Sequence, residues 1–136
     1  MQMSPVIAIH MAAAVAAVVT GPVALWARRA GTAHPRLHRA FGYAWVTLMI
    51  ATAVSALFIR DRKLPNLDGF TPIHLLIPVT LGVLAFAFWK LGRRDFGGHR
   101  RAMLSLYVLA CIVTGFFTLL PQRYLGQLLW TQLGVI

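Results

Sequence analysis

Four long runs of apolar residues, separated by basic segments, dominate the sequence. The runs cover Pro5 to Ala27, about Phe41 to Ile59, Ile73 to Trp89 and Ala102 to Leu120, and none contains Lys, Arg, Asp or Glu. Each run is close to the roughly 20 residues that a helix needs to cross a bilayer. The pattern predicts an all-α integral membrane protein, folded as one four-helix bundle over residues 1–136.

The ends of the apolar runs carry signals for helix boundaries. Ser4-Pro5 and Thr71-Pro72 each place a capping residue before a proline, and Asp95 is placed to cap the last helix. We predict helices over about residues 5–27, 37–59, 72–91 and 98–120, with Pro35 as an alternative start of the second. The segment over residues 122–136 is too short to span again, and we expect it at the membrane interface.

The formal net charge of +10 comes from basic residues that lie between the apolar runs. Of the 13 Lys and Arg residues, four fall over residues 28–39 and five over residues 90–101. Basic loops remain on the cytoplasmic side, so both chain termini are predicted to face outward. The charge indicates contact with anionic membrane lipid and not with nucleic acid.

The two halves of the chain form a weak internal repeat. The first half carries Ser-Pro, His10, Trp26, an Arg-Arg pair and His38-Arg39, and the second carries Thr-Pro, His74, Trp89, an Arg-Arg pair and His99-Arg100. Each half is therefore predicted to be one helical hairpin, and the two hairpins have the same orientation. They predict a pseudo-two-fold axis along the membrane normal.

Four of the five histidines fall into two layers of this arrangement. His10 and His74 lie near the outward starts of the first and third helices, and His38 and His99 lie at the cytoplasmic starts of the second and fourth. Ionisable residues in membrane segments usually face the bundle interior and serve function. Two neutral imidazoles opposed across a bundle are suited to axial ligation of haem iron. We expect an outer haem on the better-buried outer pair and a second haem on the inner pair.

Three arginines are placed where haem propionates would lie. Arg39 and Arg100 directly follow the inner histidines, and Arg123 comes just after the fourth apolar run, on the outer side. A guanidinium binds a carboxylate through charge-assisted hydrogen bonds. The alternative for Arg39 and Arg100 is a lipid phosphate, and for Arg123 an ordinary snorkelling side chain.

Other uses of the histidines remain open. His34 with His38 and His99 could form a three-histidine metal site, although His34 precedes a proline that disfavours helical geometry. The histidines could also bind a transition metal or relay protons without haem, or shape an interface of an accessory or assembly subunit. A buried acid–base pair is not expected, because the apolar runs contain no carboxylate.

Several stretches resemble a known family. They are "TPIHLL", "HRRAM" followed by a tyrosine, "LLPQR", and "RRAGTAHPRLHRAFGYAW" after His10. Over nearly the whole chain they resemble the bacterial membrane protein family named domain of unknown function 2306. The resemblance implies a four-helix, multi-pass protein of the bacterial inner membrane, whose motif residues are the histidines and arginines above.

The layout is more distantly similar to the four-helix dihaem cytochromes b of the b-561 type. Those proteins exchange electrons with quinone or with small oxidants and reductants. This chain departs from them by placing one histidine on each helix. We therefore expect a small haem-b cytochrome, and thus a membrane oxidoreductase, with one or two haems and quinone as a partner. The sequence leaves open whether the protein forms a homo-oligomer.

Overall fold

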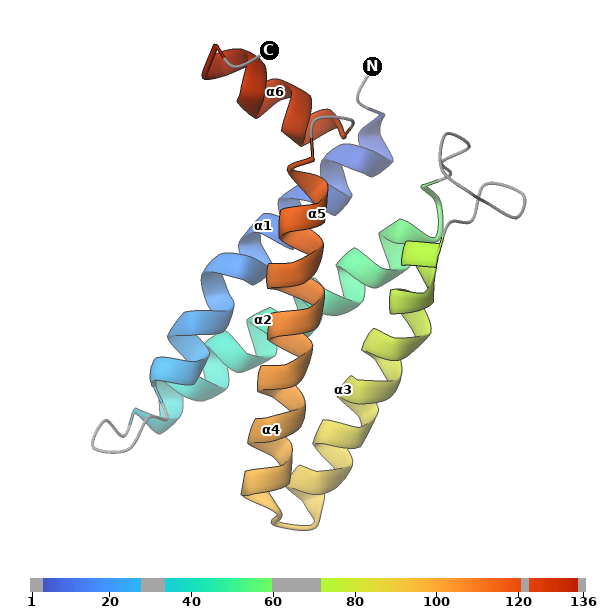
Figure 1. Ribbon diagram of the computed structural model, residues 1–136. Helices are drawn as coiled ribbons and strands as arrows, with labels where there is room; N and C mark the ends of the chain where they lie inside the picture. Colours follow the sequence, from blue (N-terminus) through green and yellow to red (C-terminus); the bar gives the residue numbers. More distant parts are fainter. Residues whose placement is uncertain (1–3, 28–33, 60–71, 121–122, 135–136) are drawn as a thin grey trace.

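The computed structural model describes residues 4–27, 34–59, 72–120 and 123–134. The elements are α1 (Pro5–Trp26), α2 (Pro35–Ala56), the 3₁₀ helix η1 (Pro72–Leu75), α3 (Leu76–Gly92), α4 (Phe96–Leu106), the π-helix η2 (Tyr107–Val113), α5 (Thr114–Thr118) and α6 (Tyr124–Gln132). The described ranges contain helices and no strand, so the predicted all-α class is confirmed (Figure 1).

Two stretches of helix are long and apolar enough to cross a membrane. They are Pro5–Trp26, which is α1, and Phe96–Thr118, which joins α4, η2 and α5 end to end. A third apolar helix, Leu76–Gly92, is shorter than a full span. Multiple membrane crossings by all four predicted helices therefore stay a prediction, as does the outward orientation of the termini.

The predicted helix-capping signals are realised wherever they fall on described residues. Ser4 Oγ accepts a hydrogen bond from the Ile7 backbone N–H at 3.3 Å, ahead of the proline that begins α1. Asp95 caps α4 in the same way, because its Oδ1 accepts from the Gly98 N–H at 2.9 Å. The second helix begins at Pro35, the alternative start. Thr71 lies outside the described residues.

The helices form two hairpins that cross each other (Figure 1). The α1 and α2 helices pack along their lengths, α3 packs on α4, and the pairs meet where α2 contacts α3 and α1 contacts η2. We call the end where α1 finishes and α2 begins the inner end, and the opposite end the outer end. The turn between α3 and α4 lies at the inner end, and α6 lies at the outer end (Figure 1).

The buried core joins all the long helices. Its members are Ala17 of α1, Trp45 and Met49 of α2, Leu84 of α3, Leu106 of α4 and Cys111 of η2. The thiol of Cys111 lies 3.9 Å from the Met49 thioether, so the single cysteine of the chain serves packing, as its position in the fourth run predicts.

The segment after Pro121 forms the short helix α6, which lies across the end of α5 (Figure 1). The Trp130 indole N–H donates to the Leu119 carbonyl at 2.8 Å and fixes α6 against the end of the preceding helix. This helical form was not predicted. Its place at the membrane interface stays a prediction.

A proline inside α1 creates the contact that joins the two hairpins. Pro22 has no backbone N–H, so the Val18 carbonyl loses the partner four residues ahead that an α-helix normally supplies. The Tyr107 hydroxyl donates to this same carbonyl at 3.0 Å. A side chain of the second hairpin therefore satisfies a backbone acceptor that the first hairpin leaves open.

Gly21 makes room for that contact. A Cβ at this position would lie 2.5 Å from Tyr107 Cε2, which is closer than real side-chain contacts allow, and 3.2 Å from Trp45 Nε1, which is tight. The missing side chain lets the Tyr107 ring lie against the α1 backbone. Tyr107 is also the first residue of the π-helix, an uncommon local geometry that often marks functional positions.

We predict that Tyr107→Phe destabilises the fold by roughly 0.5–1.5 kcal/mol, because the Val18 carbonyl loses its donor within the bundle. The loss should shrink in a Pro22→Ala background, where the restored backbone N–H at position 22 satisfies that carbonyl. Unfolding by added SDS in mild detergent measures both costs.

The matched control for this cycle is Tyr43→Phe, since Tyr43 lies on α2 with 62% of its surface exposed. That variant should leave the unfolding midpoint nearly unchanged. An equal cost of Tyr107→Phe with and without Pro22 would show that the hydroxyl does not serve the proline gap.

Candidate functional site

The outer layer of histidines begins with His10 on α1. Its Nδ1 lies 3.0 Å from the Thr52 carbonyl and 3.0 Å from Ser55 Oγ, both on α2. A carbonyl only accepts, so Nδ1 carries the hydrogen and, in the neutral ring, Nε2 keeps its lone pair. The Ser55 hydroxyl also donates to the Thr52 carbonyl at 3.0 Å, which ties all three groups together.

His74 completes the outer layer from the second hairpin. It lies on η1, and its Nε2 donates to the carbonyl of Ile59, just past α2, at 2.8 Å. Both histidines thus donate to backbone carbonyls at the outer end of the first hairpin. The structure therefore brings together the two histidines that the repeat assigns to one layer, although they are 64 positions apart in the sequence.

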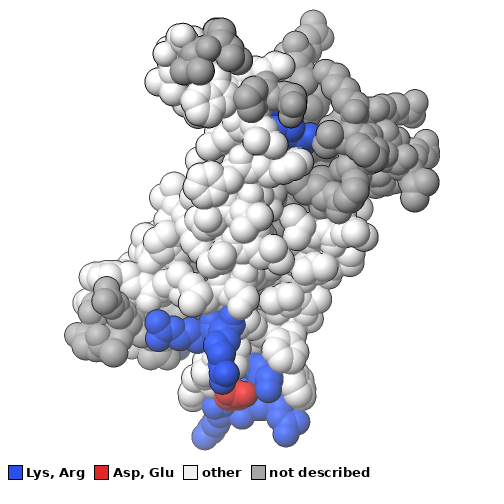
Figure 2. Space-filling view, in the orientation of Figure 1, with Lys and Arg blue, Asp and Glu red and all other residues white. Residues whose placement is uncertain are grey.

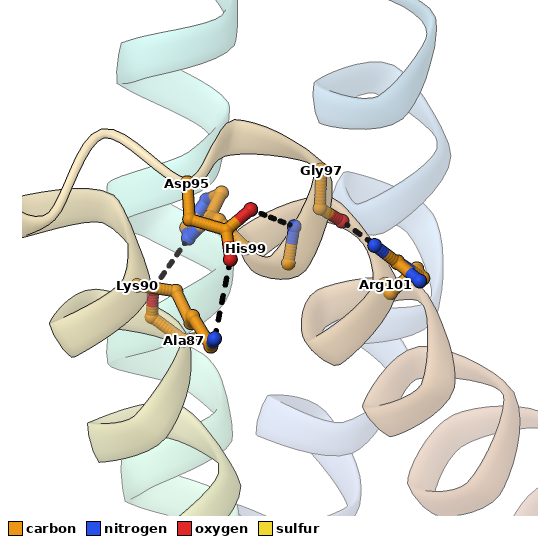
Figure 3. A network of polar contacts seen from close by, with 7 residues as sticks. Ala87, Lys90, Asp95, Gly97, His99 and Arg101 are labelled. Atoms are coloured by element: carbon orange, nitrogen blue, oxygen red, sulfur yellow. Dashed lines mark hydrogen bonds and ion pairs between the residues drawn. The ribbon is translucent and has the colours of Figure 1, made fainter.

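The inner layer is built differently, because each histidine bonds within its own hairpin. His38 on the first turn of α2 donates from Nδ1 to the Ala24 carbonyl of α1 at 2.7 Å. His99 on α4 donates from Nδ1 to the Ala87 carbonyl of α3 at 2.9 Å (Figure 3). Each ring links the start of one helix to the last turns of the helix before it. The predicted repeat is thus visible in matching side-chain geometry.

His34, the fifth histidine, stacks on the Trp26 ring with 5.4 Å between centroids and 22° between planes. Among the described residues no three His, Cys, Asp or Glu side chains come together as a metal site. The three-histidine arrangement of His34 with His38 and His99 is therefore not assembled in this structure.

The three arginines occupy different surroundings. Arg39 and Arg100 are exposed at the inner end, beside the inner histidines. Arg123 lies at the outer end, with its guanidinium 5.5 Å from the centre of the Phe117 ring. Their role in binding propionates stays a prediction.

Basic side chains gather around the inner turns. Apart from Arg123, the Lys and Arg residues that the structure describes are Arg36, Arg39, Lys90, Arg93, Arg94, Arg100 and Arg101. Figure 2 shows blue side chains concentrated at this end, around the single acidic side chain in view. The distribution fits a surface against anionic headgroups, as the charge pattern of the sequence indicates.

The turn between α3 and α4 positions His99. Asp95 N–H donates to the Lys90 carbonyl and Arg94 N–H to the Leu91 carbonyl, which is the bonding pattern of a Schellman motif. Arg94 sits at its left-handed position with φ of 58°, where glycine is the usual residue. The Asp95 carboxylate then bonds the Lys90 ammonium at 3.1 Å (Figure 3).

The hydrogen-bond partners of the histidines were not predicted from the sequence. Ser55 is an ordinary small polar residue within an apolar run, and the acceptors at positions 24, 52, 59 and 87 are backbone carbonyls. A backbone carbonyl has no side-chain signature. Ser55 carries a weak signal, since it is the only serine in the second run.

The sequence also matches a known protein family. The family described as predicted membrane protein DUF2306 matches residues 7–122. The chain belongs to this family. The match includes all five histidines of the DUF2306 protein and ends one residue before Arg123, so it leaves out α6. Neither the curated proteins nor the solved structures contain a match to this chain.

The Asp95 cap makes part of the stability of this DUF2306 protein depend on pH. The Gly98 N–H and then the Lys90 ammonium hold the pKa of the Asp95 carboxyl below its ordinary value of about 4. The folded state therefore binds fewer protons than the unfolded state near that pH. The stabilisation is complete above the ordinary pKa and is lost as pH falls through the lowered value.

We expect the SDS unfolding midpoint of the natural protein to fall from about pH 6 to about pH 3 more than that of Asp95→Asn. Asparagine keeps an oxygen that accepts from Gly98 but cannot titrate, so the difference between the two curves isolates this carboxyl. Parallel curves would contradict a lowered pKa in the folded state.

Arg94→Gly should stabilise the turn by about 1 kcal/mol, because it removes the cost of a left-handed side-chain-bearing residue. The hydrogen bonds of the motif are between backbone atoms, so they are retained. Arg93→Gly is the control: it removes the same charge at φ of −86° and should not stabilise. Equal midpoints for the two variants would rule out backbone strain as the cause.

Proposed function

We propose that the protein is a small haem-b membrane cytochrome of the bacterial inner membrane, built as a four-helix bundle with both termini outside. In this proposal it passes electrons between a quinone and a partner or small oxidant, so it acts as a membrane oxidoreductase. His10 and His74 would ligate the outer haem. His38 and His99 would ligate an inner one, if a second haem binds.

One observation carries the proposal: two imidazoles from different hairpins lie at the outer end, where His10 donates to the Thr52 carbonyl and His74 to the Ile59 carbonyl. Axial ligation needs one imidazole on each face of the porphyrin, so the two must come from separate elements. His10 lies on α1 and His74 on η1, which satisfies that requirement. The neutral donors also suit iron, since an imidazole supplies a nitrogen lone pair without adding charge to an apolar site.

The surroundings of His10 supply what a ligand histidine needs. Histidines that bind metals usually donate their other ring N–H to a carbonyl or carboxylate, which fixes the tautomer and raises the basicity of the ligating nitrogen. The Thr52 carbonyl has this relation to His10 Nδ1. Its ring is thereby held with Nε2 as the nitrogen available for coordination.

Bound haem would supply reversible one-electron exchange at iron. The chain would orient it, exclude water from it and set its electrostatics. Apolar side chains of α1 and α3 would shield the ring from water, while Arg123 at the outer end would neutralise a propionate. Arg39 and Arg100 offer the same charge to an inner haem.

The inner layer favours a second candidate function. His38 and His99 each bind a carbonyl of the helix preceding them, which is what histidines that only stabilise hairpins would do. In this alternative the protein is an accessory or assembly subunit. In a third alternative, the same histidines bind a transition metal or relay protons, and no haem is involved.

An optical spectrum of the purified full-length protein from haem-replete cells tests the proposal. We expect a Soret band and sharp α bands on reduction. His10→Ala and His74→Ala should each abolish the outer haem, whereas His34→Ala should retain full pigment because that ring stacks on Trp26. His38→Ala or His99→Ala should reduce the haem content only if an inner haem binds.

Misfolding is separated from ligand loss by His10→Gly, whose haem content should recover when free imidazole fills the vacated position. A colourless, iron-free natural protein would overturn the cytochrome. Metal analysis would then decide between a transition-metal site and a purely structural role. Full haem content in both the His10 and the His74 variants would overturn the ligand assignment alone.

A further inference from the structure

An apolar groove opens between α1 and α2 at the outer end. Its volume is about 330 Å³, and its lining residues are Val6, Ile9, Ala51, Val54, Ser55 and Phe58. Nearly all of the lining is hydrocarbon. Ile9 and Phe58 are 60% and 69% exposed, so they form rims that flank the groove and do not close it.

Ser55 is the one polar side chain in the lining, and it is connected to the histidine layer. Its Oγ lies 3.0 Å from His10 Nδ1, and its residue is only 9% exposed. Ser55 therefore forms a polar point at the base of an apolar groove, with a titratable imidazole directly behind it. Small-molecule sites typically combine such an apolar lining with a few placed polar groups.

We infer that this groove binds a lipid-soluble quinone, with a ring carbonyl accepting a hydrogen bond from the Ser55 hydroxyl. To donate outward, that hydroxyl turns away from the Thr52 carbonyl, its present acceptor. The Ser55 oxygen then accepts from the Nδ1 hydrogen of His10. The quinone carbonyl is thus joined to His10 through one intervening hydroxyl. This inference rests on the proposed function, since it places the quinone partner next to the proposed outer haem ligand.

The alternative occupant is the acyl chain of a membrane lipid, whose hydrocarbon has no polar atom to bond Ser55. An acyl chain would leave the serine bonded to Thr52 and would gain nothing from the link to His10. A quinone ring uses both the hydrocarbon walls and the hydroxyl. The chemistry of the lining therefore favours a quinone.

The test is photolabelling of the full-length protein in lipid nanodiscs with an azido-benzoquinone that carries a decyl tail. We expect saturable labelling of the outer parts of α1 and α2, competed by the unlabelled decyl benzoquinone and not by decanol. Ala51→Phe, which fills the groove, should reduce labelling about tenfold or more. Ser55→Ala should weaken competition by up to about tenfold through loss of one hydrogen bond.

Ala44→Phe is the matched control, since residue 44 lies two turns earlier on α2, is exposed and is not part of the lining. The extent of photolabelling of this variant should equal that of the natural protein. Competition by decanol equal to that by the quinone, or unchanged labelling of Ala51→Phe, would overturn the inference and leave an ordinary lipid-facing groove.

Haem content is measured in the same preparations. If the protein carries haem but shows no saturable labelling, the quinone site is refuted and the cytochrome proposal stands. If the protein is colourless but shows saturable labelling, the cytochrome proposal is refuted and the quinone site stands.

Discussion

The hydrogen bond from the Tyr107 hydroxyl to the Val18 carbonyl joins the two hairpins at a point where the first hairpin leaves a backbone acceptor open. Inside a bilayer, helices gain little from the hydrophobic effect, and close packing and polar contacts decide how they associate. Pro22 leaves one acceptor unsatisfied in α1, and an unsatisfied carbonyl is costly in hydrocarbon. Gly21 removes the obstacle to reaching it. Both residues thus direct the second hairpin to one place on the first.

This docking has different consequences for the two histidine layers. The inner histidines bond within their own hairpins, so their geometry would form even if the hairpins were apart. The outer layer needs both hairpins, since His10 belongs to the first and His74 reaches back from the second to Ile59. The outer layer is therefore the one that forms only in the complete fold. This contrast is also why the cytochrome proposal rests on the outer pair.

Much of the architecture follows from the sequence, because helix formation in apolar runs is a local and repetitive property. The positions of Ser4, Pro35 and Asp95 predicted helix starts that the structure contains. The repeat also predicted which histidines share a layer, and His10 and His74 both bond carbonyls at the outer end of the first hairpin. The partners could not be predicted, because they are backbone carbonyls and one serine hydroxyl. The π-helix likewise has no signature in the run that contains it.

The same hydrogen bond can serve both a structural and a ligating histidine, so the carbonyl contacts do not by themselves oppose the cytochrome. A carbonyl engages one ring nitrogen and fixes the tautomer, which a structural link requires and a ligand also benefits from. What separates the layers is the group beside each ring. His10 has the Ser55 hydroxyl, which reaches the base of an apolar groove. His38 and His99 lie instead at the basic inner end, beside the exposed Arg39 and Arg100. Electron exchange with a lipid-soluble carrier therefore suits the outer layer, and stabilisation of the membrane-facing turns suits the inner one.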